Sequence, residues 1–175
     1  MTTERTLLSL LEETDLPDMT TMAREPDTFK YLQFLRVMTD EEYGRFLQAK
    51  LEQIRNKTGY HWAVRLRTNG TFIGAVNLNP IKGTSFLQIG CQLKRDWWHQ
   101  GFASELMERL LQFAAKEAGL TEVYGVFEKD NFISRRLLEK LGFAWQQTKK
   151  ETPDLEIEIH KYILPSSKPS TLPII

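Results

Sequence analysis

The stretch Arg95–Glu105, RDWWHQGFASE, places bulky and polar side chains directly before the expected start of a helix, with small residues at the turn. The first amide groups of a helix have no partner within it and carry the positive end of its dipole, so they can bind an anion. Gly101 lacks a Cβ and lets a ligand approach the backbone, and Ala103 keeps the first turn nearly as open. The stretch suits a diphosphate, and a glycine helix start without any ligand is equally compatible with it.

The glycine loop differs from two common nucleotide-binding motifs. A Walker loop continues with Gly-Lys-Ser/Thr, which is absent here, and the dinucleotide-binding fingerprint needs two further glycines. The interpretation of the loop therefore depends on the elements around it.

Three strands in series are predicted before the loop, at residues 60–68, 71–81 and 85–94. The sequence TNGT forms a hairpin turn between the first two, so the three strands make an antiparallel meander.

The segment before this meander is predicted to be mainly helical. Residues 3–13 begin with a short apolar run that is compatible with an edge strand or with the first turn of a helix. Pro17, after an aspartate, signals a helix start, and Pro26 is expected to begin a second short helix. Asp40 begins a longer helix with acidic residues in its first turn, and Gly59 is expected to close it.

Apolar residues at helical spacing predict a long helix after the loop, from Ala103 to a stop at Gly119. The remaining elements are a strand, a helix capped by Asp130 or Asn131, and a terminal hairpin of two strands, at 121–127, 131–142, 143–150 and 155–164. This order predicts an α/β (α+β) fold, a mixed sheet with helices on both faces, in one domain over residues 1–164. Residues 165–175 are a Pro/Ser tail that we expect to be mobile.

Composition narrows the class of protein. Lys plus Arg and Asp plus Glu each number 23, so the formal net charge is zero, which argues against a nucleic-acid or anionic-membrane binder. The single cysteine, Cys91, excludes an internal disulfide or a zinc cluster and fits a reducing compartment. No apolar run approaches the roughly 18 residues of a membrane span, and the N-terminus does not resemble a signal peptide. We therefore expect a cytoplasmic protein that binds neither nucleic acid nor membrane and holds no metal.

Two motifs, taken together, resemble the GNAT superfamily of acetyl-CoA-dependent N-acetyltransferases. The loop Trp98–Ala103 is similar to the family's Gln/Arg-x-x-Gly-x-Gly/Ala, and Asn131–Phe143 is similar to its N-x-x-S…L-x-x-K-x-G-F. Trp98 departs from the general pattern, but tryptophan is typical of the branch containing the ribosomal-protein N-terminal acetyltransferases. Ile73–Leu78 and Ile89–Leu93 are similar to the middle strands of the family. The resemblance covers most of the chain, from residue 4 to residue 164.

The resemblance implies a seven-stranded, mostly antiparallel sheet with a splayed central pair of strands that binds acetyl-CoA as co-substrate. The expected cofactor-binding residues are Cys91, Gln92, Leu93 and Lys94 for the pantetheine arm, His99, Gln100, Gly101, Phe102, Ala103 and Ser104 for the pyrophosphate, and Trp98 and Asn131. Alternatives remain open for two of these roles. Trp97 and Trp98 could instead pack under the helix, and Asn131 could be a plain helix cap.

Acetyl transfer to an amine needs a neutral amine, a donor for the oxyanion and a proton for the leaving thiolate. The resemblance implies that backbone near Gln92 serves the oxyanion. Many relatives carry a tyrosine acid seven residues after the motif asparagine, where this chain has Leu138. The branch often uses the serine of N-x-x-S, so Ser134 is the candidate donor, although a first-turn serine can also satisfy a backbone group.

Glu158 is the candidate base or amine anchor, because relatives carry an acidic residue about four positions before a tyrosine in this strand. Glu156 is second. A solvated strand face or a water relay is an equally open alternative. A covalent role for Cys91 is disfavoured, because the family transfers the acetyl group directly.

The acceptor is a primary amine of undetermined type: a protein N-terminus, a polyamine, an amino acid or an aminoglycoside. Tyr31, Phe34 and Trp62 could wall its site or be core aromatics. The alternative function is a non-catalytic acyl-CoA-binding or sensor domain on the same fold. A third is an interaction module that docks its C-terminal tail. We expect a monomer or homodimer.

Overall fold

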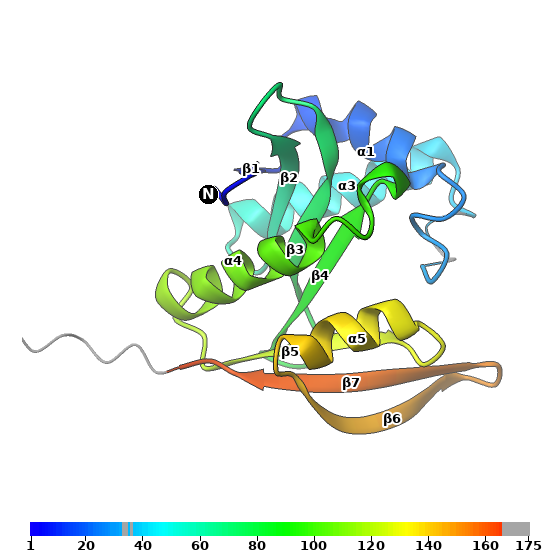
Figure 1. Cartoon of the computed structure of the whole chain (residues 1–175). Coiled ribbons are helices and arrows are strands. Elements are labelled where there is room, and N and C mark those ends of the chain that lie inside the picture. The colour runs from blue at the N-terminus through cyan, green and yellow to red at the C-terminus, as the bar shows by residue number, and fades with distance from the viewer. Residues whose placement is uncertain (33–34, 36, 166–175) are drawn as a thin grey trace, which may run out of the picture.

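A seven-stranded sheet forms the centre of the protein (Figure 1). The computed structural model describes residues 1–32, 35 and 37–165. The strands are β1 (Thr6–Leu10), β2 (Tyr60–Leu66), β3 (Phe72–Pro80), β4 (Leu87–Leu93), β5 (Glu122–Glu128), β6 (Ala144–Thr152) and β7 (Leu155–Ile163). The α-helices are α1 (Leu16–Ala23), α3 (Asp40–Arg55), α4 (Phe102–Lys116) and α5 (Phe132–Lys140), and short 3₁₀ turns occupy Glu13–Asp15 (η1) and Arg95–Trp97 (η2).

The strand order β1-β2-β3-β4-β5-β7-β6 contains one parallel junction, between β4 and β5. All other neighbours are antiparallel. A single residue pair, Gln88 with Tyr124, joins β4 to β5, whereas β3 and β4 pair from Gly74–Leu93 to Pro80–Leu87. The central strands therefore diverge toward their carboxyl ends, and the predicted splayed pair is confirmed.

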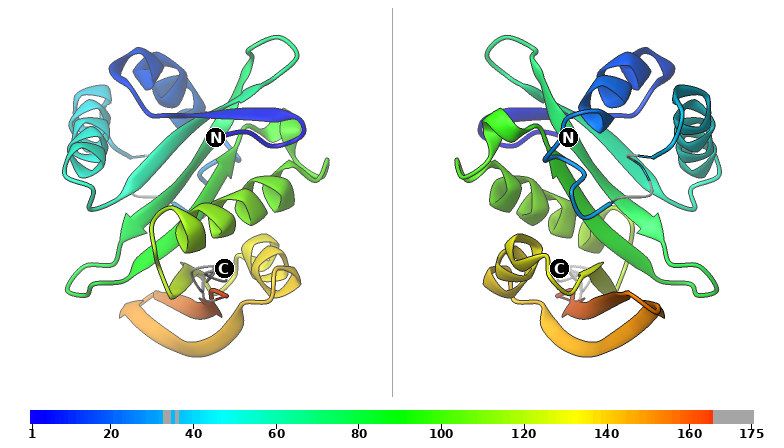
Figure 2. Two further views of the ribbon diagram at one scale, coloured as in Figure 1. Left: turned by 90° about the vertical axis from the view of Figure 1, so that its left-hand side faces the viewer. Right: turned by 90° about the vertical axis from the view of Figure 1, so that its right-hand side faces the viewer.

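Helices cover both faces of the sheet (Figure 2). On one face, α1 and α3 bury side chains such as Met22 and Leu47 against the small residues Ala63 and Ala75 of β2 and β3. On the other face, α4 forms the larger core with the alternate residues of the same strands. This two-sided packing is what the alternating strand pattern requires. The predicted fold class is confirmed.

The structure corrects some predicted boundaries and decides one open alternative. Residues 6–10 are an edge strand paired with β2, not a helix turn. Residues 26–31 form turns in place of the short helix expected from Pro26. Helix α3 begins at Asp40 as predicted, with Thr39 in a capping box, but it ends at Arg55. The chain leaves it through Lys57, whose φ of 54° is left-handed, so Gly59 is not the stop.

The predicted mobile tail, apart from Pro165, lies outside the described residues. In the described part of the chain, no helix is long and apolar enough to cross a membrane.

Candidate active site

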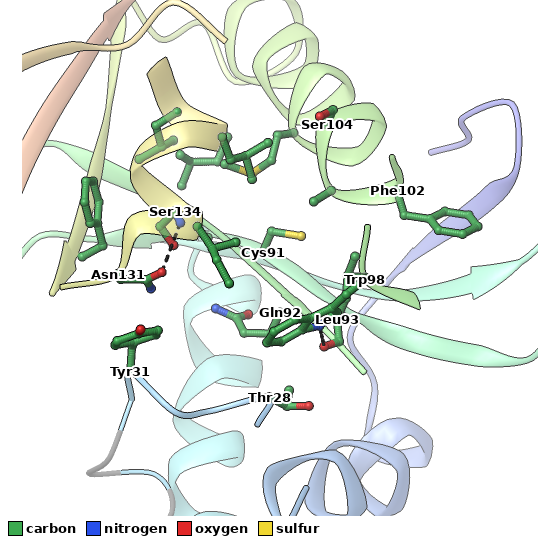
Figure 3. Close-up of a pocket in the computed structure, with 18 of the residues that line it drawn as sticks. Thr28, Tyr31, Cys91, Gln92, Leu93, Trp98, Phe102, Ser104, Asn131 and Ser134 are labelled. Carbon is green, nitrogen blue, oxygen red and sulfur yellow. Dashed lines mark hydrogen bonds between the residues drawn. The ribbon is translucent and has the colours of Figure 1, made fainter. Parts of the chain in front are cut away.

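A cavity of about 350 Å³ opens where β4 and β5 diverge (Figure 3). Its walls come from β4, β5, the first turns of α4 and α5, and the segment before α3. Most of the predicted cofactor-binding residues line it: Cys91, Gln92, Leu93, Trp98, His99, Gly101, Phe102, Ala103, Ser104 and Asn131. The candidate donor Ser134 lines it as well. Residues of the two motifs, far apart in sequence, thus line one cavity.

The first turn of α4 presents unbonded amide groups to this cavity. Gly101 is the N-cap residue, makes no side-chain cap, and accepts the first helical hydrogen bond from Glu105 at 3.2 Å. The amides of Phe102, Ala103 and Ser104 consequently have no hydrogen-bond partner among the described residues. Three free N–H groups at the positive end of a helix are a site for phosphate oxygens.

The requirement for glycine at position 101 is conformational. Its φ of 82° is left-handed, and a Cβ there would meet only Arg5 Nη2, at 3.5 Å. Space alone would tolerate a small side chain, so the glycine is needed for the turn that exposes the helix end.

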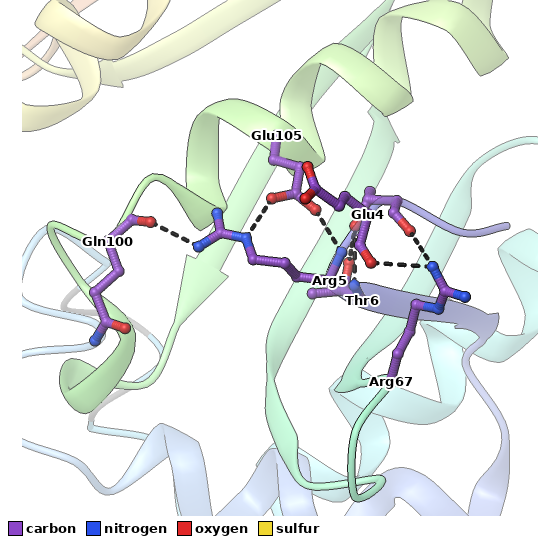
Figure 4. A network of polar contacts seen from close by, with 7 residues as sticks. Glu4, Arg5, Thr6, Arg67, Gln100 and Glu105 are labelled. Carbon is purple, nitrogen blue, oxygen red and sulfur yellow. Dashed lines mark hydrogen bonds and ion pairs between the residues drawn. The ribbon is translucent and has the colours of Figure 1, made fainter.

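Arg5, which directly precedes β1, holds the loop against the helix (Figure 4). Its Nε donates to Glu105 Oε2 at 2.7 Å, its backbone amide donates to Glu105 Oε1 at 3.0 Å, and its Nη1 donates to the Gln100 carbonyl at 2.9 Å. The guanidinium also stacks 3.9 Å from the centre of the Phe102 ring. Burial opposes ionisation of Glu105, but hydrogen bonds from Thr3 and Arg5 outweigh it, and the pKa of this carboxyl is lowered.

Trp97 and Trp98 pack against the residues around the glycine loop and also line the cavity. Trp97 packs edge-on against Phe102, with ring centres 5.8 Å apart, in the way expected for a residue under the helix. Trp98 donates its indole N–H to the Leu93 carbonyl at 2.7 Å, which ties the loop to the end of β4, and Arg95 covers its ring.

Two predicted cofactor residues do not line the cavity. The Lys94 amide bonds to the Ile73 carbonyl at 2.9 Å, and its ammonium lies 3.4 Å from Glu25. The Gln100 side chain donates to the Asp96 carbonyl at 2.7 Å. Both residues shape the ends of the loop instead.

Asn131 caps helix α5 and leaves the Ser134 hydroxyl free. The Asn131 Oδ1 accepts from the Ser134 amide at 3.1 Å, while the hydroxyl of Ser134 forms no hydrogen bond to the described residues. Leu138 packs on Gly125 of β5, where a Cβ would lie 2.3 Å from its Cδ1. The position at which many relatives carry a tyrosine is thus a buried packing contact here.

Glu158 lines neither this cavity nor a second one on the α3 side of the sheet. It is 7% exposed on β7, its two oxygens accept from Arg135 of α5, and Oε2 lies 3.1 Å from His160 Nε2. A carboxylate bound on both sides in this way ties α5 to β7. The structure therefore does not bring this predicted base to the site. Glu156 pairs with Lys129 at 2.7 Å on the surface.

A second cavity, of about 530 Å³, lies on the α3 side of the sheet and meets the first near the ends of β4 and β5. Tyr31 and Trp62 line it, as considered from sequence, whereas Phe34 is not among the described residues. Glu128, the last residue of β5, lines both cavities. Burial and the nearby charge of Asp130 raise the pKa of Glu128 above its usual value. The sequence reading missed Glu128, although an acidic residue at a strand end beside the motif asparagine was a usable signal.

The Acetyltransferase (GNAT) domain family model matches residues 5–144 of the chain. The protein belongs to the GNAT acetyltransferase family.

Individual relatives agree with this assignment. The chain is 23% identical over 142 residues to an uncharacterized N-acetyltransferase, YoaA, of Bacillus subtilis, covering 81% of this chain and 80% of that one. The fold is similar to RimL, a ribosomal L7/L12 alpha-N-protein acetyltransferase solved with coenzyme A, with a TM-score of 0.80, 15% identity and coverage of 92% and 95%. It is also similar to spermidine N-acetyltransferase from Vibrio cholerae with CoA and spermine, with a TM-score of 0.77, 17% identity and coverage of 91% and 95%.

Family membership confirms the resemblance to GNAT acetyltransferases that was inferred from the two motifs. The chain is thus an acetyltransferase of the N-acetyltransferase class.

Proposed function

We propose that the protein transfers an acetyl group directly from acetyl-CoA to a primary amine, with the two substrates entering from opposite faces of the sheet. The observation that carries this proposal is the junction of two cavities at the splayed strands, with free helix-end amides in one and an acidic group on the shared wall. One cavity suits a phosphorylated thioester, and the other suits its acceptor.

In this proposal the loop and strand residues bind acetyl-CoA. The amides of Phe102, Ala103 and Ser104 receive the pyrophosphate, because they have no other partner among the described residues. The unpaired edges of β4 and β5 accept the pantetheine arm, since the strands share only one residue pair. That relatives were solved with CoA supports this placement.

Glu128 is the proposed general base. A carboxyl with a raised pKa takes a proton from an ammonium group more readily than an ordinary exposed one. Its place on the wall between the cavities puts it where the acceptor amine must reach the thioester. The neutral amine then adds to the thioester carbonyl and forms the C–N bond, and the resulting tetrahedral oxyanion breaks the C–S bond to release the CoA thiolate. The proton that the nitrogen loses leaves with the thiol or passes to solvent.

Ser134 is the proposed donor to the departing sulfur. Its hydroxyl makes no hydrogen bond to any described residue, and the residue lines the acetyl-CoA cavity. A thiol has a pKa near roughly 8.5, so a neutral hydrogen bond is sufficient and no strong acid is required. The β4 backbone near Gln92 remains the proposed donor to the oxyanion. Cytoplasmic location and a monomeric or dimeric state stay predictions.

The test combines cofactor binding with turnover. Calorimetry should detect CoA binding, and a thiol-release assay with acetyl-CoA should respond to at least one acceptor in a panel of peptides, amino acids, polyamines and aminoglycosides. CoA binding without release across the whole panel would favour a non-catalytic acyl-CoA-binding domain.

A further inference from the structure

Four polar side chains that line the second cavity are joined in a row by hydrogen bonds. Lys50 Nζ donates to Asn79 Oδ1 at 3.1 Å, Asn79 Nδ2 donates to Asn77 Oδ1 at 2.6 Å, and Asn77 Nδ2 donates to Gln92 Oε1 at 3.2 Å. All four residues line this cavity, and Gln92 lines the acetyl-CoA cavity as well. The row therefore runs from α3 across β3 to the place where the two cavities meet.

The direction of every hydrogen bond in this row is set by Lys50. An ammonium group can only donate, so Asn79 must turn its oxygen to Lys50 and its –NH₂ to Asn77. Asn77 then turns its own –NH₂ to Gln92, which must accept through Oε1. The orientation of the last amide is fixed by a charge at the other end of the row.

The sheet is built to hold this row. Asn77 pairs with Gly90 across β3 and β4, and a Cβ on Gly90 would lie 2.7 Å from Asn77 Oδ1. The missing side chain leaves room for the Asn77 amide to lie across the strand and reach Gln92.

The row ends in a free donor. With Oε1 occupied, the –NH₂ of Gln92 has no hydrogen-bond partner in the part of the chain that the structure describes. Figure 3 shows this nitrogen directed toward the open space beside Tyr31 and Asn131. Gln92 and Tyr31 line both cavities, so the donor lies where the two cavities share a wall, which is where the proposed function requires the acceptor amine to reach the thioester.

We infer that Lys50, Asn79 and Asn77 position the Gln92 amide so that its –NH₂ binds an oxygen of the acceptor, which makes the acceptor an amine with a neighbouring carbonyl, such as a peptide N-terminus. This inference rests on the proposed function. An aliphatic polyamine has no oxygen to offer, and it would also bring positive charge toward Lys50. Among the described residues, no carboxylate lies within ion-pair distance of Lys50, so its charge is not cancelled locally.

The substitution Asn79→Asp tests the inference, because it reverses the direction of the hydrogen bonds in the row while the volume of the side chain stays the same. The introduced carboxylate accepts from Lys50 but cannot donate to Asn77, so Asn77 turns its –NH₂ to the carboxylate and its oxygen to Gln92. The Gln92 –NH₂ then turns to Asn77, and its oxygen faces the acceptor.

The probes are trialanine amide and its isostere with a trans alkene in place of the first peptide bond. Asn79→Asp should lower kcat/KM for trialanine amide by about tenfold or more, because a hydrogen bond is replaced by two facing oxygens. For the isostere the loss should stay below about twofold, since it has no carbonyl at that bond. Comparing variant with wild type for each probe removes the difference in amine basicity between them.

Asn69→Asp is the matched control. Asn69 is exposed in the β2–β3 hairpin, and its Oδ1 accepts from the Thr71 amide, which aspartate can also do. It makes the same change of charge outside the cavity and should leave both rates unchanged. Gln92→Met should lower the rate for trialanine amide only, and adding Asn79→Asp to it should cause no further loss.

An equal loss for both probes would overturn the inference and would place Gln92 on the thioester instead. No loss for either would also overturn it. Calorimetry of both probes on the CoA-saturated protein decides the matter without turnover: wild type should bind trialanine amide more tightly than the isostere, and equal or absent binding contradicts the inference. Absence of CoA binding and thiol release, by contrast, would remove the proposed function.

Discussion

The guanidinium of Arg5 and the carboxylate of Glu105 lie 2.7 Å apart and join the first strand of the sheet to the first turn of α4. Arg5 also holds the Gln100 carbonyl of the glycine loop at 2.9 Å. The residue thus fixes the loop and the helix relative to each other. The amide groups that we assign to the pyrophosphate depend on this relation for their direction.

Arg5→Met should weaken CoA binding by about fivefold, because the loop loses a charge-assisted hydrogen bond that orders it. The stability loss should stay below about 1 kcal/mol, since the pair is partly exposed. Calorimetry and urea unfolding measure the two effects. Arg67→Met is the control, because the Arg67 side chain donates to the Thr3 and Glu4 carbonyls in the same network and does not reach the loop. Equal CoA affinity in both variants would contradict the role of Arg5.

Gly101→Ala should lower stability by about 1 kcal/mol, since alanine is strained at a φ of 82°. It should also weaken CoA binding, because relief of the strain rotates the free amides. Gly119→Ala is matched to it: Gly119 has a φ of 64°, with open space around it, just past the other end of the same helix. It should show a similar stability loss with unchanged CoA affinity. If both variants bind CoA like wild type, the loop does not hold the pyrophosphate.

Ser134→Ala should lower kcat by about fivefold, the effect of one neutral hydrogen bond, while CoA affinity is retained. Helix α5 should remain intact, because the Asn131 cap bonds to the Ser134 backbone amide and not to the hydroxyl. Steady-state kinetics with calorimetry separate the two quantities. An unchanged kcat in a regime limited by chemistry would remove Ser134 as donor.

Glu128→Gln should change the shape of the pH profile. With Glu128 as base, the reactive pair is the carboxylate and the ammonium form of the acceptor. The kcat/KM should therefore be level between the Glu128 pKa, which is raised above 4.5, and the pKa of the acceptor amine. Below the Glu128 pKa it should fall with pH.

In the glutamine variant only the free amine reacts, so kcat/KM should rise about tenfold per pH unit up to the amine pKa. At neutral pH the rate should be lower by about 100-fold. An identical pH profile in both proteins would rule out this base. Glu158→Gln is the companion variant: it should keep the wild-type profile while losing about 2 kcal/mol of stability, because it breaks the ion pair with Arg135.

His61 should stay neutral in the folded protein down to acid pH. Burial, and then the charge of Lys50, lower the pKa of His61 from 6.5 to about 3. An unfolded chain binds this proton first, so the contribution of His61 to stability is present above pH 6.5 and is lost as pH falls toward about 3. An NMR titration measures the His61 pKa directly. Lys50→Met should raise it, and an unchanged value would show that the charge of Lys50 is not felt there.

Much of the fold and of the cofactor loop could be predicted because local patterns determine them. The alternation in β2 and β3 and the helical spacing of α4 are properties of contiguous residues. The glycine loop before a helix and the asparagine cap of α5 are local as well, and both line one cavity.

The remaining site depends on contacts between distant segments, which a single sequence does not show. Glu158 looked free on its strand because its partner, Arg135, comes from a helix more than 20 residues earlier. Glu128 gained its importance from the junction of two cavities, and Gln92 from a lysine on α3. Trp98 is a local case: its indole donates to the Leu93 carbonyl only five residues earlier, but the sequence pattern does not show this hydrogen bond.

The most direct test of the central claim is a titration of the ¹⁵N-labelled protein with CoA, followed by NMR. The account predicts that the largest shifts of amide resonances fall on Phe102, Ala103 and Ser104, whose N–H groups are free to bind phosphate oxygens. Saturable binding that leaves these three resonances in place, or no binding at millimolar CoA, would contradict it.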